Sequence, residues 1–288
     1  MSDKKEYEHI KVDLPKKADK DGNIIRERID GNYAVISLNR PDKLNAITLQ
    51  TLEEITNALE KMELDLGIRC VVLRGTKDYT KKPSFSTGQD LNAIFLPGLK
   101  PDIPWHMPQF IRKYHHYFNL IEEFPKPIIA AIDGYALGGG TELSCTCDII
   151  IASRRSTFGV TEISRGIFPA GGGTQRLIRY IGLARATRML YFGERFSAEK
   201  MHDWGLVTFL VEDDNFENLL HEKASELGRA ATTSLIVMKR CVRMGTQVPL
   251  GIGLQLEQLG MGINYQAKDV MEGVKAFMKR KDPEFKGF

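Results

Sequence analysis

The feature that most constrains the fold is the stretch 128–143, which joins an apolar run, a glycine cluster and the start of a helix. The apolar run Ile128–Ile132 stops at Asp133-Gly134, which is typical of a buried strand that ends in a turn. The glycines 138–140 that follow allow the backbone to approach a ligand closely. Because the first amides of a helix have no partner within it, the stretch predicts a site for a phosphate or a developing oxyanion.

The motifs that would select a phosphate are absent from this stretch. No Gly-Lys-Ser/Thr triplet occurs, and Leu143 stands where a dinucleotide-binding turn would have its last glycine. The turn carries an acid instead, because Glu142 lies in the first turn of the expected helix. An acid at this position either takes part in chemistry or only complements the helix dipole, and this stretch alone leaves both interpretations open.

Composition excludes several classes of protein. A chain of 288 residues can form one large domain or two. A net charge of +3 is too small to indicate binding to nucleic acid or to a membrane surface, and no apolar run is long enough for a transmembrane helix. The start of the chain mixes both signs of charge and lacks an apolar core, so we expect a cytoplasmic protein without a targeting signal.

Metal and hydrolase motifs are also lacking. Cys145 and Cys147 form a C-x-C pair, but no second pair and no nearby histidine completes a tetrahedral set. We therefore expect buried, reduced thiols and no metal site. The chain has no H-E-x-x-H and no G-x-S-x-G motif, which argues against a zinc protease and a serine hydrolase.

Regular elements are predicted along much of the chain. Alternation within 24–30 and 33–38 around Gly31-Asn32 favours a hairpin, and 10–14 could pair as an edge strand. The segment 48–64 is predicted to be a helix whose buried face comprises Leu52, Ile55, Leu59 and Met62. Cys70–Leu73 is typical of a buried strand, and a second glycine cluster at 171–173 opens another helix.

A long segment, 94–109, contains four prolines together with Trp105. We expect a loop there, followed by a helix from 111 to 124, because proline-rich segments of this length rarely form regular structure. Such a loop either forms the wall of a pocket or lies in solvent, and its tryptophan favours the pocket wall.

Several motifs in a fixed order resemble those of the crotonase, or enoyl-CoA hydratase/isomerase, superfamily, and most closely its hydratase branch. The resemblance extends from about Ile24 to Phe285. The matching segments are Arg40–Ala46, Phe85–Leu91, Pro127–Glu142, Phe158–Glu162, Pro169–Leu177 and Glu272–Phe277.

The resemblance implies an α/β fold, a crotonase-type spiral of ββα turns with a C-terminal helical trimerisation region. We accordingly expect a charged extension at 1–22, a core with the active site at 23–204 and a mostly helical region at 205–288. It also implies a homotrimer or homohexamer and an acyl-CoA thioester substrate. Coenzyme A would be part of the substrate, and no separate cofactor, nucleic acid or membrane partner is expected.

Four residues carry the chemistry that the resemblance implies. The thioester oxygen would accept hydrogen bonds from the backbone amides of Gln89 and Gly139, the latter within the triple glycine. Glu142 and Glu162 match positions where hydratases of the family have glutamates. Adding water to an activated double bond requires a base for the water and an acid for the α-carbon, and two glutamates beside one water can share these roles. We assign the base to Glu142 and the acid to Glu162.

Binding of the coenzyme A portion is expected at positions that match the family in several parts of the chain. These positions are Lys43, Leu44, Ala46, Gly88, Asp90, Leu91, Asn92, Gly138, Pro169, Phe277 and Arg280. Many relatives have lysine in place of Asn92, so one phosphate contact is in doubt. Arg280 would act from a neighbouring subunit, or it is simply part of a solvated helix end.

Departures from the family pattern leave alternatives open. Thr161 precedes Glu162 where proline is frequent, and Ser164-Arg165 follow it where apolar residues are common. Arg165 could contact a polar acyl end or point to solvent. An isomerase or a C–C hydrolase of the same superfamily is the first alternative function. An RNA-binding or scaffolding protein on the same fold is a more distant one, and the low net charge argues against it.

Overall fold

Two β-sheets form the centre of the protein. The computed structural model describes residues 7–15, 17–18, 24–26, 31–92 and 99–288. The larger sheet has the strand order β1-β4-β5-β7-β9-β12, and the smaller has the order β11-β10-β8-β6. The strands of the larger sheet are β1 (Ile10–Asp13), β4 (Tyr33–Leu38), β5 (Cys70–Gly75), β7 (Ile128–Ile132), β9 (Ile149–Ser153) and β12 (Phe209–Val211). Those of the smaller are β6 (Ser84–Ser86), β8 (Tyr135–Leu137), β10 (Thr157–Gly159) and β11 (Arg195–Ser197).

From β5 to β10, consecutive strands alternate between the two sheets. β5, β7 and β9 pair in parallel in the larger sheet, while β6, β8 and β10, which follow each of them, pair in parallel in the smaller. A helix follows each pair: α2 (His106–Glu123), α3 (Gly139–Ser144) and α4 (Gly173–Ile181). This repetition is the spiral of ββα turns that the resemblance implies, and the predicted fold class is confirmed.

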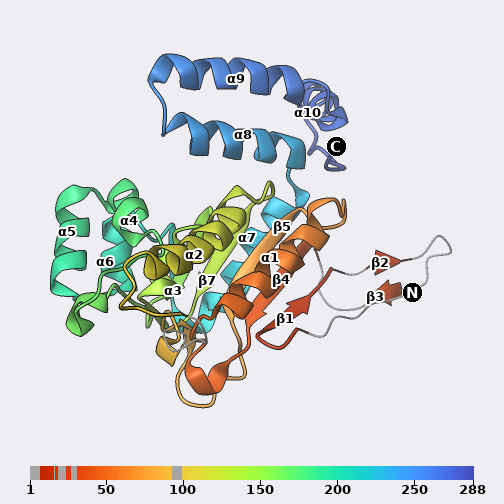
Figure 1. Cartoon of the computed structure of the whole chain (residues 1–288). Helices are drawn as coiled ribbons and strands as arrows, with labels where there is room; N and C mark the ends of the chain where they lie inside the picture. Colours follow the sequence, from red (N-terminus) through yellow and green to blue (C-terminus); the bar gives the residue numbers. More distant parts are fainter. Residues whose placement is uncertain (1–6, 16, 19–23, 27–30, 93–98) are drawn as a thin grey trace.

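The core lies on both faces of the larger sheet because its central strands are apolar along most of their length. In β5, Val71 and Leu73 belong to one buried cluster, while Cys70 and Val72 belong to another. Since successive side chains of a strand point to opposite faces, a continuous apolar run requires cover on both sides. α1 (Leu49–Glu63) and α2 lie over one face and α7 (Phe216–Arg229) over the other (Figure 1).

The predicted helix at 48–64 is confirmed as α1. Its four expected core residues, Leu52, Ile55, Leu59 and Met62, are all buried. Thr48 starts the helix, since its side chain accepts a hydrogen bond from the amide of Thr51 and that residue's hydroxyl accepts one from the amide of Thr48. This reciprocal pair satisfies two amides that the helix itself leaves without partners.

Two local predictions were wrong. α2 begins at His106, inside the segment expected to be a loop; Pro108 falls in its first turn, where a missing N–H costs nothing. Residues 93–98 of that segment lie outside the described residues. The hairpin of 24–30 with 33–38 is not seen among the described residues, where β4 pairs with β1 over Val35–Leu38 on one edge and with β5 on the other. β3 (Ile24–Arg26) pairs instead with β2 (Lys17–Ala18), and 27–30 are not described.

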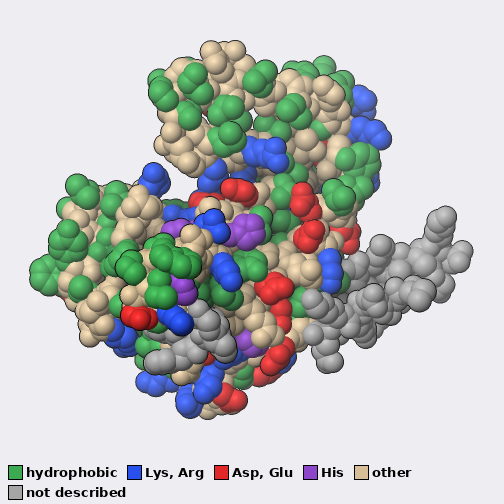
Figure 2. All heavy atoms as spheres, in the orientation of Figure 1, with side chains coloured by type: hydrophobic (Ala, Val, Ile, Leu, Met, Phe, Trp, Pro, Cys, Tyr) green, Lys and Arg blue, Asp and Glu red, His purple; other side chains and the backbone are tan. Residues whose placement is uncertain are grey.

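The C-terminal part is mostly helical. α5 (Leu183–Phe192) and α6 (Ala198–Asp203) precede β12, and α7 packs on the larger sheet. α8 (Thr232–Gly245), α9 (Leu250–Asn264) and α10 (Lys268–Met278) stand apart from the sheets at the top of Figure 1. Hydrophobic side chains cover much of this upper part in Figure 2, and those exposed on α9 include Leu250, Leu259, Met261 and Ile263. Treating 1–22, 23–204 and 205–288 as separate units stays a prediction.

Candidate active site

The turns that follow β6 and β8 come into contact. These two strands pair in parallel, and each leads directly into a glycine turn. A Cβ atom placed on Gly88 would lie 2.9 Å from the amide nitrogen of Gly139, and one placed on Gly139 would lie 3.3 Å from the amide nitrogen of Gln89. Gly88 also has φ +94°, a conformation that glycine adopts without strain. The sequence therefore brings the two expected donor amides side by side.

Both amides are free to bind a ligand. Ile47 donates to the carbonyl of Gly88 at 2.8 Å, and Asp90 donates to the carbonyl of Ile47 at 2.8 Å. In this parallel bridge the N–H of the intervening residue, Gln89, faces away from Ile47. Gly139 is the first residue of α3, so its amide has no acceptor within the helix. Among the described residues neither amide has a hydrogen-bond acceptor, and we name this pair the oxyanion niche.

Glu162 lies against the oxyanion niche. It begins a 3₁₀ turn, η3 (Glu162–Arg165), and its Oε1 would be 2.6 Å from a Cβ atom placed on Gly138. Gly138 therefore has to be glycine both for this approach and for its own φ of +53°. The other oxygen, Oε2, is buried and has no hydrogen-bond partner in the described part of the chain. Burial raises the pKa of Glu162, against the opposing effects of its own backbone amide and of Arg165.

Glu142 lies in the first turn of α3 and is only 4% exposed. Its Oε1 accepts a hydrogen bond of 2.7 Å from the amide of Gly173, and its Oε2 would be 2.7 Å from a Cβ atom on Gly171. Burial and the nearby charge of Glu162 raise the pKa of Glu142 to about 7, although the amides of Gly173 and Gly171 and the charge of Arg176 lower it. No side chain larger than glycine at 171 or 173 would leave room for this carboxyl.

The arrangement combines three properties at one place. Two unpaired amides and the start of a helix can stabilise negative charge on an oxygen atom. Two carboxyl groups beside them have raised pKa values, and the charge of one acts on the other. Carboxyls in this condition can exchange protons near neutral pH, as general acid–base catalysis requires. The site can therefore polarise a carbonyl group and move protons next to it.

Most of the positions expected to bind coenzyme A form one cluster of loops beside the oxyanion niche. Arg40 joins the loop that contains Ala46 to the loop that contains Asp90. It forms an ion pair of 3.0 Å with Asp90 and donates to the carbonyl of Ala46 at 2.6 Å. Asp90 also accepts hydrogen bonds from Asn92. The expected residues within or bordering this cluster are Lys43, Leu44, Ala46, Gly88, Asp90, Leu91 and Asn92.

Other expected positions lie elsewhere. Pro169 packs beside the second glycine cluster, since its Cβ would be 3.3 Å from a Cβ atom on Gly173. Phe277, which is 85% exposed, and Arg280 lie on or just after α10, which stands apart from α3 (Figure 1). Within one chain these two do not join the site, so their role stays a prediction that requires a neighbouring subunit. Arg165 folds back onto Thr161, with Nη1 at 3.3 Å from its carbonyl oxygen.

The contacts that hold Glu142 were not foreseen from the sequence. Gly171 and Gly173 belong to a cluster expected only to open a helix, yet they lie against the carboxyl of Glu142. Phe118 of α2 also reaches this turn, with its Cε2 at 2.7 Å from a Cβ atom placed on Gly171. The available signal was a second triple glycine before a helix, the same pattern that marked the first.

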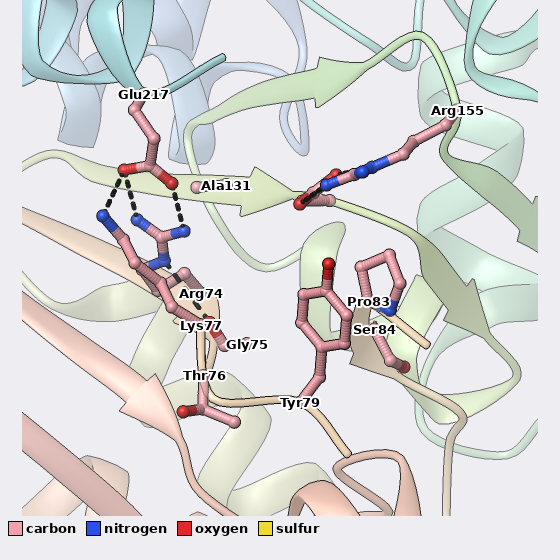
Figure 3. A pocket seen from close by; sticks show the side chains of 11 residues that line it. Arg74, Gly75, Thr76, Lys77, Tyr79, Pro83, Ser84, Ala131, Arg155 and Glu217 are labelled. Carbon is pink, nitrogen blue, oxygen red and sulfur yellow. Dashed lines mark hydrogen bonds and ion pairs between the residues drawn. The ribbon is translucent and has the colours of Figure 1, made fainter. Parts of the chain in front are cut away.

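A cavity of about 190 Å³ lies in a different place, beyond the ends of β5 and β7 (Figure 3). Its lining includes Arg74, Lys77 and Arg155, which are cations, but all three are paired. Arg74 and Lys77 bind Glu217 at 2.6 and 2.7 Å, and Arg155 binds Asp133 through two hydrogen bonds. The cavity shares no residue with the oxyanion niche and the two glutamates.

Three of the four cysteines, Cys70, Cys145 and Cys147, are buried, and none of the four forms a disulfide. In the described ranges, no group of three or more His, Cys, Asp or Glu side chains is arranged to hold a metal ion. None of the helices described combines the length and apolar character that a membrane crossing needs.

Comparison with known proteins places the chain in a family. Residues 28–287 match the family model described as enoyl-CoA hydratase/isomerase. A 2,3-dehydroadipyl-CoA hydratase from Escherichia coli is 33% identical over 88% of this chain and 94% of its own length. A 1,2-epoxyphenylacetyl-CoA isomerase from the same organism is 30% identical over 91% of this chain and 98% of its own.

Among solved structures, an enoyl-CoA hydratase from Bacillus anthracis superposes with a TM-score of 0.84 at 33% identity, covering 98% of this chain and 100% of that one. The family match spans both glycine turns, both glutamates and the C-terminal helices. The chain therefore belongs to the enoyl-CoA hydratase/isomerase family, within the crotonase superfamily.

Proposed function

We propose that this protein is an enoyl-CoA hydratase, which adds water across the 2,3 double bond of an enoyl-CoA thioester or catalyses the reverse dehydration. The observation that carries the proposal is the position of two carboxyls with raised pKa values, Glu142 and Glu162, beside the oxyanion niche. Hydratases among the relatives support it.

The proposed mechanism assigns each proton and electron pair to a group in the site. The thioester oxygen accepts hydrogen bonds from the amides of Gln89 and Gly139. Glu142 takes a proton from water as the water oxygen forms a bond to C3, and the electrons of the double bond move to the thioester oxygen. Glu162 then gives its proton to C2, and the electrons return from that oxygen to restore the thioester carbonyl. Coenzyme A is part of the substrate, and no further cofactor is proposed.

The environment suits these roles. A base with a pKa of about 7 accepts a proton more readily than an ordinary carboxylate and is still partly ionised at neutral pH. The unpartnered Oε2 of Glu162 can carry the proton that is delivered to C2. Each donor of the oxyanion niche is expected to lower the barrier by about 3 kcal/mol, the typical loss when such a donor is removed.

We also propose that three copies of the chain, or two sets of three, assemble through α8, α9 and α10. Exposed apolar residues on these helices support this, because a surface of this kind is usually covered by a partner. In such an assembly Phe277 and Arg280 would meet the coenzyme A bound by another subunit through Lys43 and its neighbouring loop. Light scattering with size exclusion, which gives the mass in solution, tests this part. The cytoplasmic location stays a prediction.

One other activity has specific support. A relative that is 30% identical is a 1,2-epoxyphenylacetyl-CoA isomerase, and an isomerase also needs the oxyanion niche and an acid–base group. The two activities differ in their use of water. An isomerase would interconvert its thioesters without incorporating solvent oxygen, whereas a hydratase incorporates one oxygen atom from water in each product molecule.

The deciding experiment measures the loss of absorbance of the conjugated thioester as water is added. Crotonyl-CoA, a six-carbon enoyl-CoA with a terminal carboxylate, and an aromatic enoyl-CoA form a suitable panel, because one relative is a 2,3-dehydroadipyl-CoA hydratase. The incorporation of ¹⁸O into products formed in ¹⁸O-labelled water is then measured by mass spectrometry. Incorporation of label with any member supports the hydratase; turnover without label would assign an isomerase, and the absence of both would contradict the proposal.

A further inference from the structure

The turn that holds Glu142 has little to fix its own shape. Residues 171–173 are all glycine, so they have no side chains to pack, and their backbone has more freedom to lose than that of other residues. Gly171 and Gly173 must lack side chains because of the carboxyl of Glu142. Contacts from elsewhere in the fold therefore have to keep this turn, and the amide that binds Glu142, in place.

Arg176 supplies such a contact from α4. Its Nη1 donates to the carbonyl of Gly171 at 3.2 Å, and a Cβ atom on Gly172 would collide with this same nitrogen. The guanidinium thus lies against Gly172, whereas the carboxyl of Glu142 lies against Gly171 and Gly173. The second contact is from α2, where Nε2 of His115 lies 2.6 Å from the carbonyl oxygen of Ala170.

Arg176 is itself held firmly. Its Nε and Nη2 bind Oε2 of Glu122 at 3.0 and 2.6 Å, and Nη2 also donates to Asn119 at 2.9 Å. The side chain of Arg176 is only 13% exposed, so water competes weakly with this pair. The planar guanidinium, which donates to both Glu122 and Asn119, is fixed in one orientation. The ammonium group of a lysine could not reproduce this set of contacts.

The same glutamate connects the turn to the C-terminal helices. Oε1 of Glu122 accepts a hydrogen bond of 2.7 Å from Arg243 of α8. Arg243 also donates to the carbonyl of Cys147 at 2.8 Å and to Asp148 at 3.3 Å, and Lys239 of α8 pairs with Asp148 at 2.7 Å. One continuous chain of charged groups therefore runs from α8 to the glycine turn.

We infer that Arg176 is a positioning residue for Glu142, which keeps the amide of Gly173 aimed at the carboxyl by holding the turn 171–173, and that Glu122 and Arg243 link this turn to α8. The inference rests on the proposed function for its kinetic consequences, but its structural part does not depend on the reaction. An ordinary stabilising ion pair would contribute to folding without a selective effect on this turn or on the chemical step.

The charged groups around Glu142 come from three elements. Glu162 of η3 raises the pKa of Glu142 and Arg176 of α4 lowers it, while Glu122 of α2 lies behind Arg176 and partly neutralises it. Removal of the positive charge at 176 is therefore expected to raise the pH at which Glu142 becomes ionised. Replacement by lysine keeps the charge and removes the planar contacts, so the two effects can be separated.

The test compares Arg176→Lys, Arg176→Gln and Glu122→Gln with the unmodified protein. The matched control is Arg188→Lys on α5, which removes a similar two-bond pair with Glu194 that is exposed and includes no residue of the glycine turn. Hydration of crotonyl-CoA is measured against pH, and hydrogen exchange by mass spectrometry follows the amides of residues 169–177.

We expect Arg176→Lys to lower kcat roughly 10- to 100-fold with KM changed less than about twofold, because a small displacement of a catalytic group has effects of this size. Arg176→Gln should in addition move the ionisation seen in kcat/KM to higher pH. Glu122→Gln should give a smaller loss of the same kind, and Arg188→Lys none. Exchange should rise at 171–173 in the Arg176 variants but not in the control.

Unchanged kcat and unchanged exchange at 171–173 in folded Arg176→Lys would overturn the inference. A rise in exchange spread evenly over α4 and α5 would also overturn it, since that pattern indicates general loosening. If the unmodified protein does not hydrate enoyl-CoA thioesters, the proposed function fails, and the exchange measurement alone still decides the role of Arg176.

Discussion

Glu142 at the start of α3 and Glu217 at the start of α7 are acidic groups held in opposite ways. Glu142 is buried, forms no ion pair with any cation in the described part of the chain, and has a pKa of about 7 because of burial and the charge of Glu162. Burial also acts to raise the pKa of Glu217, but hydrogen bonds and charge from Arg74 and Lys77 outweigh it and lower the pKa to about 2. Figure 3 shows Glu217 with both cations on one side of it.

The difference separates a carboxyl that can exchange protons near neutral pH from one that stays ionised. Glu217 is stabilised in its charged form and has no tendency to take up a proton near neutral pH. Glu142 is destabilised in its charged form and can lose or gain a proton under the conditions in which an enzyme works. The cavity beside Glu217 offers no comparable group, because it is lined by ion pairs that already satisfy each other.

The largest expected effect concerns activity. Glu142→Gln should lower the rate of hydration roughly 10²- to 10⁴-fold, because an amide cannot take the proton of water. Glu217→Gln, the matched change in the structural carboxyl, should leave kcat and KM within about twofold. Steady-state rates with crotonyl-CoA check both variants. Equal losses in the two variants would remove the distinction between the two acids.

The next effect concerns stability, which Glu142→Gln should increase although it lowers activity. Folding raises the pKa of this acid from 4.5 to about 7, so the folded protein loses stability as the pH rises through that range. Glutamine does not ionise, so Glu142→Gln should become more stable than the unmodified protein by up to about 3 kcal/mol above pH 7. Urea unfolding at acid and alkaline pH, at one protein concentration, measures this difference.

A gain from Glu142→Gln that is the same at every pH would contradict the assignment of a raised pKa. A gain that appears between about pH 4.5 and 7 and then stays constant would support it. The activity lost by this variant and the stability that it gains would then have one cause, the charged carboxyl in a buried position.

The smallest expected effect is at Glu217. Folding lowers its pKa from 4.5 to about 2, so its contribution to stability is complete above pH 4.5 and is lost as the pH falls through 2. The side chain is 48% exposed, and solvent screening limits the loss in Glu217→Gln to about 1 kcal/mol at neutral pH. Thermal unfolding across acid pH checks this, and a difference that grows towards low pH would refute it.

Local signals in the sequence were sufficient for the elements that carry the site. Ile128–Ile132 forms β7 with the predicted bounds, and Gly138, which follows the short strand β8, has the positive φ that glycine adopts without strain. The buried face of α1 was predicted correctly because its apolar residues recur at helical spacing and all pack against one core. The roles of Glu142, Glu162 and the niche amides rest on the resemblance and on their present geometry, and they stay proposals.

Partnerships between distant segments were beyond local signals. Nothing within 24–38 reveals that β4 has β1 and β5 on its two edges, or that Ile24–Arg26 pairs with β2 in place of β4. The pairing of Arg176 with Glu122 joins two helices that meet only in the finished fold. The start of α2 was missed for a different reason, because proline breaks a helix in its interior but not in its first turn.

The pairing of β6 with β8 has a consequence for how such a protein can change. The two niche donors are main-chain groups in the turns that follow two paired strands, and Ser86 of β6 pairs with Ala136 of β8 just before those turns. A substitution at Gln89 therefore exchanges a side chain and leaves its N–H where it was. On the proposed function, stabilisation of the oxyanion and choice of acyl group can therefore diverge independently, so a descendant could acquire a new substrate without having to rebuild the means of activating it.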